Sequence, residues 1–196
     1  EGHGVLLPYL AEGTKNACSV YYGEVSSPLA HAANGATGQA EGVLKQLGWT
    51  LKHPIVKSLA YLSLYDNAAC LGFCNLYGDP LPANNAINVA SHLLDGRPLL
   101  DDLPGLPDNI EQICVAGGDD RQTLMLWSEE SQTLLIPCHG TEVDLIDLLG
   151  RTDRLSVADG NVSVHVTPTP QLIRARFRGN GTAGEGHGAG SMVHLK

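Results

Sequence analysis

Two short apolar runs near the start of the chain have the composition of buried β-strands. The first covers residues 18–24 and ends at Glu24, and the second covers residues 55–66 and ends at Asp66. Short apolar runs bounded by turn-forming residues are typical of strands that are buried in a sheet. In both runs a carboxylate directly follows the apolar stretch, so each predicted strand ends on an acidic side chain.

The segment between these runs predicts a loop followed by a helix. Residues 25–38 are rich in Ser, Ala, Gly and Asn, which is typical of a long loop. Residues 38–50 then carry apolar side chains at the spacing of one helix face, and a His-Pro pair ends the pattern. Strand, loop, helix and strand form a βαβ unit, whose two strands are parallel neighbours. Glu24 and Asp66 are therefore expected at the same edge of the sheet, where α/β folds build their sites.

A second helix and then a series of short strands follow. Residues 83–94 predict the helix, which ends at Asp95 and Gly96, and a linker rich in Pro, Asp and Leu covers residues 97–109. Closely spaced strands with turn signals between them predict an antiparallel β-sandwich. The expected strands cover residues 110–115, 122–127, 133–136, 143–147 and 162–166, with turns at 117–120 and 159–161. Trp127, which ends one of these strands, is expected in the sandwich core.

Composition and charge restrict the classes of partner. The 196 residues are 43% hydrophobic and 17% charged, and the net charge is −9. This acidic balance argues against nucleic acid or an anionic membrane surface as a partner, because both attract basic proteins. No stretch approaches the roughly 20 consecutive apolar residues of a membrane span, so none is expected.

The start of the chain and two glycosylation sequons bear on localisation. The sequence begins with Glu1 and not with Met, so we expect that an upstream segment has been removed. The sequons begin at Asn161 and Asn180. Together they favour a secreted or vacuolar/lysosomal protein, with a cytoplasmic location still open.

The cysteines do not indicate a metal site. Five are present, so they cannot all pair within the chain. Cys70 and Cys74 have a CxxxC spacing, but no second Cys/His pair lies at the spacing of a zinc site. We expect neither a metal nor a cofactor.

Taken in order, these elements resemble the C-terminal portion of a retaining glycoside hydrolase of clan A. In that clan, strand seven of a (β/α)8 barrel often ends in an aromatic or apolar run followed by Gly-Glu, as Tyr22, Gly23 and Glu24 do here. Strand eight is resembled by residues 61–66. Residues 77–86 resemble the loop that follows strand eight. Residues 93–98 resemble the end of the last barrel helix.

The later strands resemble the accessory sandwich that follows such barrels, and the similarity covers about residues 16–175. The segments that carry it are 123–127, 143–151 and 162–170, the last resembling the terminal strand. The resemblance implies an α/β plus all-β fold: the last two βα units of a (β/α)8 barrel over residues 1–100 and an antiparallel β-sandwich over 101–178. Residues 179–196 form a Gly-rich stretch that is expected to be a disordered tail.

The resemblance also implies a chemistry. Retaining hydrolysis uses two carboxylates, one as nucleophile and one as acid and then base. Glu24 would be the nucleophile that forms the glycosyl-enzyme intermediate. Tyr22 or Tyr65 would position it or stack on the sugar, and Asp66 would bind a sugar hydroxyl. From the residues alone, Tyr22 fits a core position equally well and Asp66 fits the cap of a turn.

The chain departs from the family pattern in one important respect. The acid/base of clan A lies at the end of strand four, usually in an Asn-Glu pair, and no Asn-Glu occurs in this sequence. Strands one to six also have no counterpart. A complete barrel takes about 250 residues, so the expected partner is a second protein chain that carries the rest of the barrel and the acid/base carboxylate, and the expected substrate is a carbohydrate.

Three hypotheses follow. The first is the C-terminal chain of a split or processed retaining glycoside hydrolase, inactive as an isolated chain. The second is a non-catalytic carbohydrate-binding or structural module within a larger assembly. The third is an independent small α/β hydrolase, against which no Gly-x-Ser-x-Gly motif is present.

Overall fold

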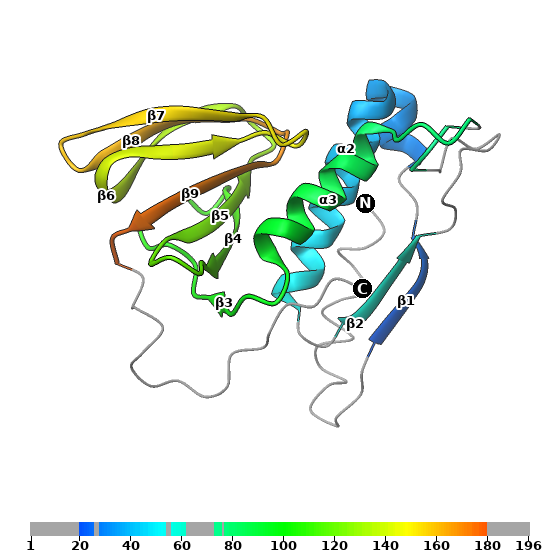
Figure 1. Cartoon of the computed structure of the whole chain (residues 1–196), viewed down its shortest axis with the longest axis horizontal. Coiled ribbons are helices and arrows are strands. Elements are labelled where there is room, and N and C mark those ends of the chain that lie inside the picture. Colours follow the sequence, from blue (N-terminus) through cyan, green and yellow to red (C-terminus); the bar gives the residue numbers. More distant parts are fainter. Residues whose placement is uncertain (1–19, 26–27, 54–55, 62–72, 76, 180–196) are drawn as a thin grey trace.

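The computed structural model describes the backbone of residues 20–25, 28–53, 56–61, 73–75 and 77–179. Side chains are described for residues 35–53, 73–75 and 77–179. These parts form three layers (Figure 1): an antiparallel sheet structure, a pair of helices, and a two-stranded parallel sheet on the other side of the helices. The predicted tail, from residue 180 onward, lies outside the described residues.

The parallel sheet contains the two strands predicted near the start of the chain. Strand β1 (Val20–Val25) pairs in parallel with β2 (Val56–Tyr61). This confirms that the two strands are parallel neighbours. The predicted second strand continued to Asp66, which lies outside the described residues.

Helix α2 (Pro28–Lys52) begins earlier than the sequence predicts. The prediction of a long loop over 25–38 is wrong for most of that range, because the segment is helical from Pro28 onward. Ala is the best helix former, and the run from Leu29 to Ala33 contains three alanines, which outweighs the loop signal of its polar neighbours. Gly35 interrupts the helix with φ 66° and ψ −153°, a backbone conformation that is essentially restricted to glycine, so the element is two helices joined at a kink.

Helix α3 (Pro82–Leu94) agrees with the predicted helix over 83–94. Proline stands at its first turn, where a missing N–H costs nothing. The chain leaves the helix at Asp95, and Gly96 follows with φ 67°, as the predicted glycine stop requires.

The antiparallel structure has seven strands in the order β3-β4-β5-β9-β6-β7-β8, with a further pairing of β6 with β8. The strands are β3 (Leu99–Leu100), β4 (Glu111–Ala116), β5 (Gln122–Trp127), β6 (Gln132–Ile146), β7 (Thr152–Ala158), β8 (Asn161–Val166) and β9 (Gln171–Phe177). The first half of β6 pairs with β8, and its second half pairs with β7 and β9. The sheet therefore folds over on itself as two layers that share β6.

Two details of the predicted sandwich are corrected. The expected strands 133–136 and 143–147 are one strand of 15 residues, β6, which passes through Gly140 at φ 98°. The strands β7 and β9 were not predicted, so the run at 162–166 is not the terminal strand. The sequence patterns of these two strands are weak, because most residues of β7 are exposed and β9 carries two arginines on one face.

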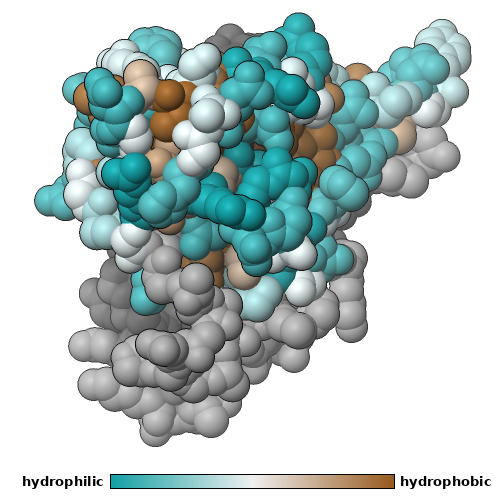
Figure 2. Space-filling model, turned by 60° about the vertical axis from the view of Figure 1, so that its left-hand side comes forward, coloured by the Kyte–Doolittle hydropathy of each residue, from teal (hydrophilic) through white to brown (hydrophobic). Residues whose placement is uncertain are grey.

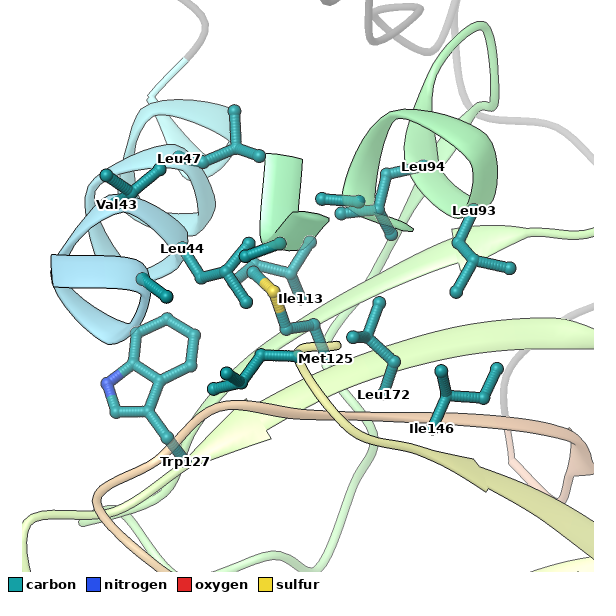
Figure 3. Close-up of a cluster of buried hydrophobic side chains, with 14 of the residues drawn as sticks. Val43, Leu44, Leu47, Leu93, Leu94, Ile113, Met125, Trp127, Ile146 and Leu172 are labelled. Atoms are coloured by element: carbon teal, nitrogen blue, oxygen red, sulfur yellow. The ribbon is translucent and has the colours of Figure 1, made fainter. Parts of the chain in front are cut away.

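The antiparallel sheet has an apolar cluster on each side. The sandwich-interior cluster includes Cys114, Leu124, Ile136, Val164 and Ile173, which face into the space between the two layers. The helix-facing cluster lies on the opposite side (Figure 3), and its sheet residues contact apolar side chains of α2 and α3. The members labelled in the figure are Val43, Leu44, Leu47, Leu93, Leu94, Ile113, Met125, Trp127, Ile146 and Leu172.

Trp127 is buried, with 6% of its surface exposed, but it packs under the helices and not between the sandwich layers. The predicted burial of Trp127 is therefore confirmed, but the predicted side of the sheet is wrong: Trp127 lies on the helix-facing side and not in the sandwich interior. Residues alternate between faces along a strand, and Trp127 shares its face with Met125. Both faces of β5 are buried, so its apolar residues run without alternation and the sequence does not reveal which face is which.

Candidate active site

The backbone places Glu24 at the carboxyl end of the parallel sheet. Glu24 is the last but one residue of β1, and Val25 pairs with Tyr61 at the end of β2. The pairing has a register shift here, because Gly23 and Glu24 lie opposite the single residue between Leu59 and Tyr61. Such a bulge twists a strand and redirects its side chains, and bulges are over-represented next to active sites.

The four predicted site residues differ in what the structure describes of them. Tyr22 and Glu24 lie on β1, two residues apart, and their side chains are outside the described part. Tyr65 and Asp66 lie outside the described residues altogether. The roles assigned to these four side chains therefore stay predictions.

A tight turn precedes α3. Cys74 forms a bridge with Pro80, and the backbone N–H of Leu81 donates to the carbonyl of Phe73. The Asn75 side chain accepts from the backbone N–H groups of Tyr77 and Asp79, both at 2.9 Å. Tyr77, at the tip, is 92% exposed. The sequence places Tyr77 at the start of the loop segment 77–86 without assigning it a role; an aromatic residue beside Gly78 in a turn is the signal for an exposed side chain there.

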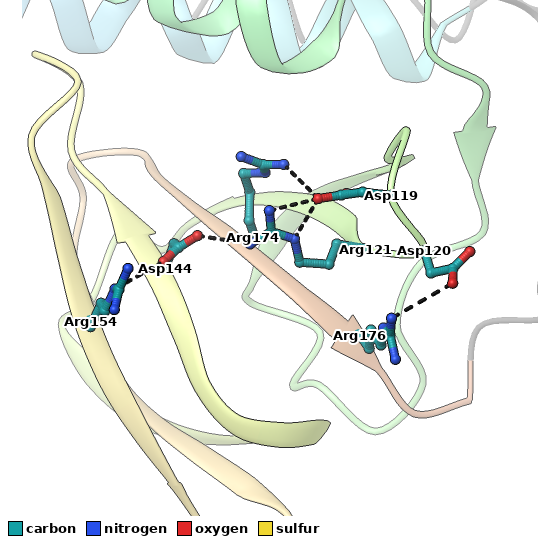
Figure 4. Close-up of polar contacts among 7 residues, drawn as sticks. All are labelled: Asp119, Asp120, Arg121, Asp144, Arg154, Arg174 and Arg176. Carbon is teal, nitrogen blue, oxygen red and sulfur yellow. Dashed lines mark hydrogen bonds and ion pairs between the residues drawn. The ribbon is translucent and has the colours of Figure 1, made fainter.

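The outer face of the antiparallel sheet carries a network of ion pairs where the helices do not cover it (Figure 4). Arg121 binds Asp119 through Nη2 at 2.6 Å and Asp144 through Nη1 at 3.0 Å. Arg174 also binds Asp119, at 3.3 Å, and Arg154 lies 4.0 Å from Asp144. Each carboxylate in this network therefore has a guanidinium partner.

The electrostatics of this network stabilise its charged forms. The hydrogen bond from the Arg121 side chain lowers the pKa of Asp119, and it outweighs the slight desolvation that acts in the opposite direction. The same hydrogen bond raises the pKa of Arg121. A carboxylate held in its charged form by arginines is a poor proton donor, so these residues fit a structural role better than acid catalysis.

Two of the three described cysteines are too deeply buried to act as nucleophiles, whereas Cys74 is partly exposed. Cys114 and Cys138 are fully buried in the sandwich-interior cluster. Burial raises the pKa of the Cys138 thiol, which disfavours the reactive thiolate. Within the described ranges no group of three or more His, Cys, Asp or Glu side chains is arranged to hold a metal ion.

The described surface of the sandwich lacks exposed aromatic side chains. Its two aromatics, Trp127 and Phe177, are 6% and 5% exposed. The face seen in Figure 2 is largely hydrophilic, with small separate apolar spots. In the part of the chain that the structure describes, no helix is long and apolar enough to cross a membrane.

Comparison with solved structures shows the fold. The chain superposes on a family 39 glycoside hydrolase from the gut symbiont Bacteroides cellulosilyticus WH2 with a TM-score of 0.71 and 18% identity, over 86% of this chain and 37% of that one. The chain has the fold of part of a glycoside hydrolase. This agrees with the resemblance to the C-terminal portion of a clan A enzyme.

Two further structures support the same fold. The catalytic domain of family 30 xylanase C from Talaromyces cellulolyticus has a TM-score of 0.54 and 12% identity, over 83% of this chain and 40% of that one. CelM2, a bifunctional glucanase-xylanase from a metagenome library, has a TM-score of 0.53 and 14% identity, over 88% of this chain and 34% of that one. The chain thus spans only 34% to 40% of the length of these three proteins. No family model and no curated protein matches the sequence.

Proposed function

We propose that this chain is the C-terminal part of a retaining glycoside hydrolase, in which Glu24 is the nucleophile. The observation that carries the proposal is the position of Glu24: it lies in a register shift at the carboxyl end of a parallel strand pair, within a fold shared with glycoside hydrolases. Carboxyl ends of parallel strands are where barrel enzymes place their catalytic side chains.

In the proposed reaction, Glu24 attacks the anomeric carbon of the sugar and the leaving group departs as the C–O bond breaks. An acid/base carboxylate about 5–5.5 Å away protonates the leaving oxygen and later activates water. This second carboxylate comes from outside the 196 residues, on a partner chain that also supplies the other barrel strands. Tyr22, Tyr65 and Asp66 position Glu24 or bind the sugar.

The sandwich serves as a support in this proposal. The helix-facing cluster fixes α2 and α3 against the sheet, and these helices lie next to the strands that carry the site. The alternative of a carbohydrate-binding module receives no support from the described sandwich surface, because its aromatic side chains are buried.

The test is covalent trapping in the complex of this chain with its copurifying partner. Activated 2-deoxy-2-fluoro glycosides of xylose and glucose are the probes, since xylanase and glucanase are the activities named for two similar structures. A slow-hydrolysing adduct is expected on Glu24, located by peptide mass. Glu24→Gln should lower hydrolysis by roughly 10⁴- to 10⁶-fold, the scale for losing a covalent nucleophile.

Glu130→Gln is the matched control, because Glu130 is an exposed glutamate after β5. It should leave hydrolysis unchanged. An active complex in which Glu24→Gln has wild-type activity, with the adduct on another residue, would assign the chain a non-catalytic structural role instead. The chain on its own should show no hydrolysis, since it has one of the two carboxylates.

A further inference from the structure

Tyr77 differs from the other aromatic residues whose side chains are described. It is 92% exposed, whereas Trp127 and Phe177 are buried and Trp49 and Phe73 are partly buried. An aromatic side chain carries a large apolar face. Tyr77 therefore presents almost all of that face to solvent.

Hydrogen bonds between Asn75 and the residues from Tyr77 to Asp79 close the turn that carries Tyr77. The Asn75 side chain accepts two backbone hydrogen bonds across the turn, and its amide donates to the Asp79 carboxylate at 2.8 Å. The backbone adds a hydrogen bond from Asn75 N–H to the Asp79 carbonyl at 2.8 Å, and another from Gly78 to Asn75 at 3.0 Å. Gly78 has φ 88°, which suits glycine at this place. A side chain on a preordered turn loses little backbone entropy when it binds a ligand.

The turn lies at the end of the molecule where the candidate site would be. It lies shortly before the first residue of α3, Pro82, and Figure 1 shows it at the end of the helix layer toward which β1 and β2 run. Glu24 is at that end of β1. The turn that carries Tyr77 and the carboxyl end of β1 therefore lie toward the same end of the helix layer, while the sandwich lies on the other side of the helices (Figure 1).

We propose that Tyr77 stacks on a sugar ring of an oligosaccharide substrate, at a subsite away from the bond that is cleaved. This inference rests on the proposed function of the chain. A sugar ring has an apolar face of C–H groups that packs on an aromatic face, while its hydroxyls stay hydrated at the edge. Two polar groups of the same turn can hydrogen-bond those sugar hydroxyls: the Tyr77 hydroxyl and the Asp79 carboxylate.

The test uses the complex of the chain with its partner, with xylohexaose and cellohexaose as long substrates and aryl xylosides and glucosides as short ones. Tyr77→Ala should raise KM for the accepted hexasaccharide by roughly 5- to 50-fold, the scale of one lost stacking contact. The kcat should stay unchanged, and so should all constants for the aryl glycoside. Tyr77→Phe keeps the aromatic face and should keep most of the affinity.

A matched control and a binding measurement separate the possible outcomes. Leu135→Ala removes the next most exposed large apolar side chain among those described, 67% exposed and on the sandwich strand β6, and should leave KM and kcat unchanged. Titration of the Glu24→Gln complex with the same hexasaccharide measures binding without turnover, and Tyr77→Ala in that background should weaken it by the same factor.

Two results would overturn the stacking role. One is an unchanged KM for the hexasaccharide in Tyr77→Ala, while Glu24→Gln still abolishes hydrolysis; the proposed function then stands without Tyr77. The other is loss of the copurifying chain in Tyr77→Ala with unchanged sugar binding in the complex that remains, which assigns Tyr77 to the protein interface. A fully active Glu24→Gln complex refutes the proposed function itself and is recognised separately.

Discussion

The antiparallel sheet with its two helices and the parallel strand pair differ in where their stability comes from. The first unit has an apolar cluster on each side of the sheet and buries both within the chain. The parallel pair is different: among the described residues β1 pairs only with β2, so each strand has one open edge. Open edges pair readily with further strands, and a two-stranded sheet is marginal by itself.

This difference bears on function, because the candidate nucleophile is on the less self-sufficient unit. The antiparallel unit holds the helices in place, and in the proposed function the parallel pair contributes Glu24 to a site that other strands complete. The following predictions test this contrast.

Hydrogen exchange should show the largest effect. In the isolated chain, amides of β1 and β2 should exchange about 10³-fold faster than those of β5 and β9, because local opening costs far less than the global unfolding of a domain, about 5–15 kcal/mol. Adding the partner chain should slow exchange in β1 and β2 selectively. Equal protection of the two units in the isolated chain would contradict the contrast.

Gly48→Leu should destabilise the antiparallel unit next most strongly. A Cβ at Gly48 would lie 2.5 Å from Met125 Cε, 2.7 Å from Ile113 Cδ1 and 3.0 Å from Trp127 Cη2, so any side chain there forces these neighbours to shift, and a leucine forces a larger shift than a single Cβ. Overpacking there should lower the free energy of unfolding by about 3 kcal/mol, measured by urea denaturation.

The control for this variant is Gly118→Leu, in the exposed turn between β4 and β5. Its nearest neighbour to an added Cβ is Arg97 Nη1 at 3.6 Å, an ordinary contact. The free energy of unfolding should change by less than about 0.5 kcal/mol. Equal changes in the free energy of unfolding for the two variants would contradict a stabilising role of the helix-facing cluster.

Asp119→Asn should show the smallest effect, and one that depends on pH. The Arg121 hydrogen bond lowers the pKa of Asp119 in the folded state. A lowered pKa contributes stability that is present above the unfolded pKa, about 3.9, and is lost as the pH falls through the folded value. The variant should therefore be slightly less stable than wild type at neutral pH, with a difference that disappears in acid.

Thermal unfolding across pH measures this difference. Asp120→Asn is the comparison variant, because Asp120 is 89% exposed and its carboxylate lies 3.6 Å from Arg176. It should follow the wild-type curve closely, since exposed pairs contribute little. A difference between Asp119→Asn and wild type that persists below pH 3 would assign the effect to packing and not to charge.

Much of the local structure was predictable from the residues. The parallel neighbours β1 and β2, helix α3 with its glycine stop, and strand β5 follow from apolar runs, helix-spaced positions and turn residues. The kinked start of α2 was not, because loop-forming residues and alanines compete in that segment of the sequence. Strand β9 was not predicted either. Arg174 and Arg176 interrupt its apolar pattern, because they lie on the part of the sheet face that the helices do not cover (Figure 4).

By itself the sequence determined that Glu24 lies at the end of a short strand, after a glycine, and that a βαβ unit precedes an antiparallel sandwich. The tertiary structure decided which face of each strand meets the helices and which carries the ion pairs. It also made β6 one strand shared by two layers, and it left Tyr77 exposed to solvent in the turn before α3. The physical reason is that residue patterns record local geometry and burial, whereas the partner of each buried or charged side chain depends on segments far away in the chain.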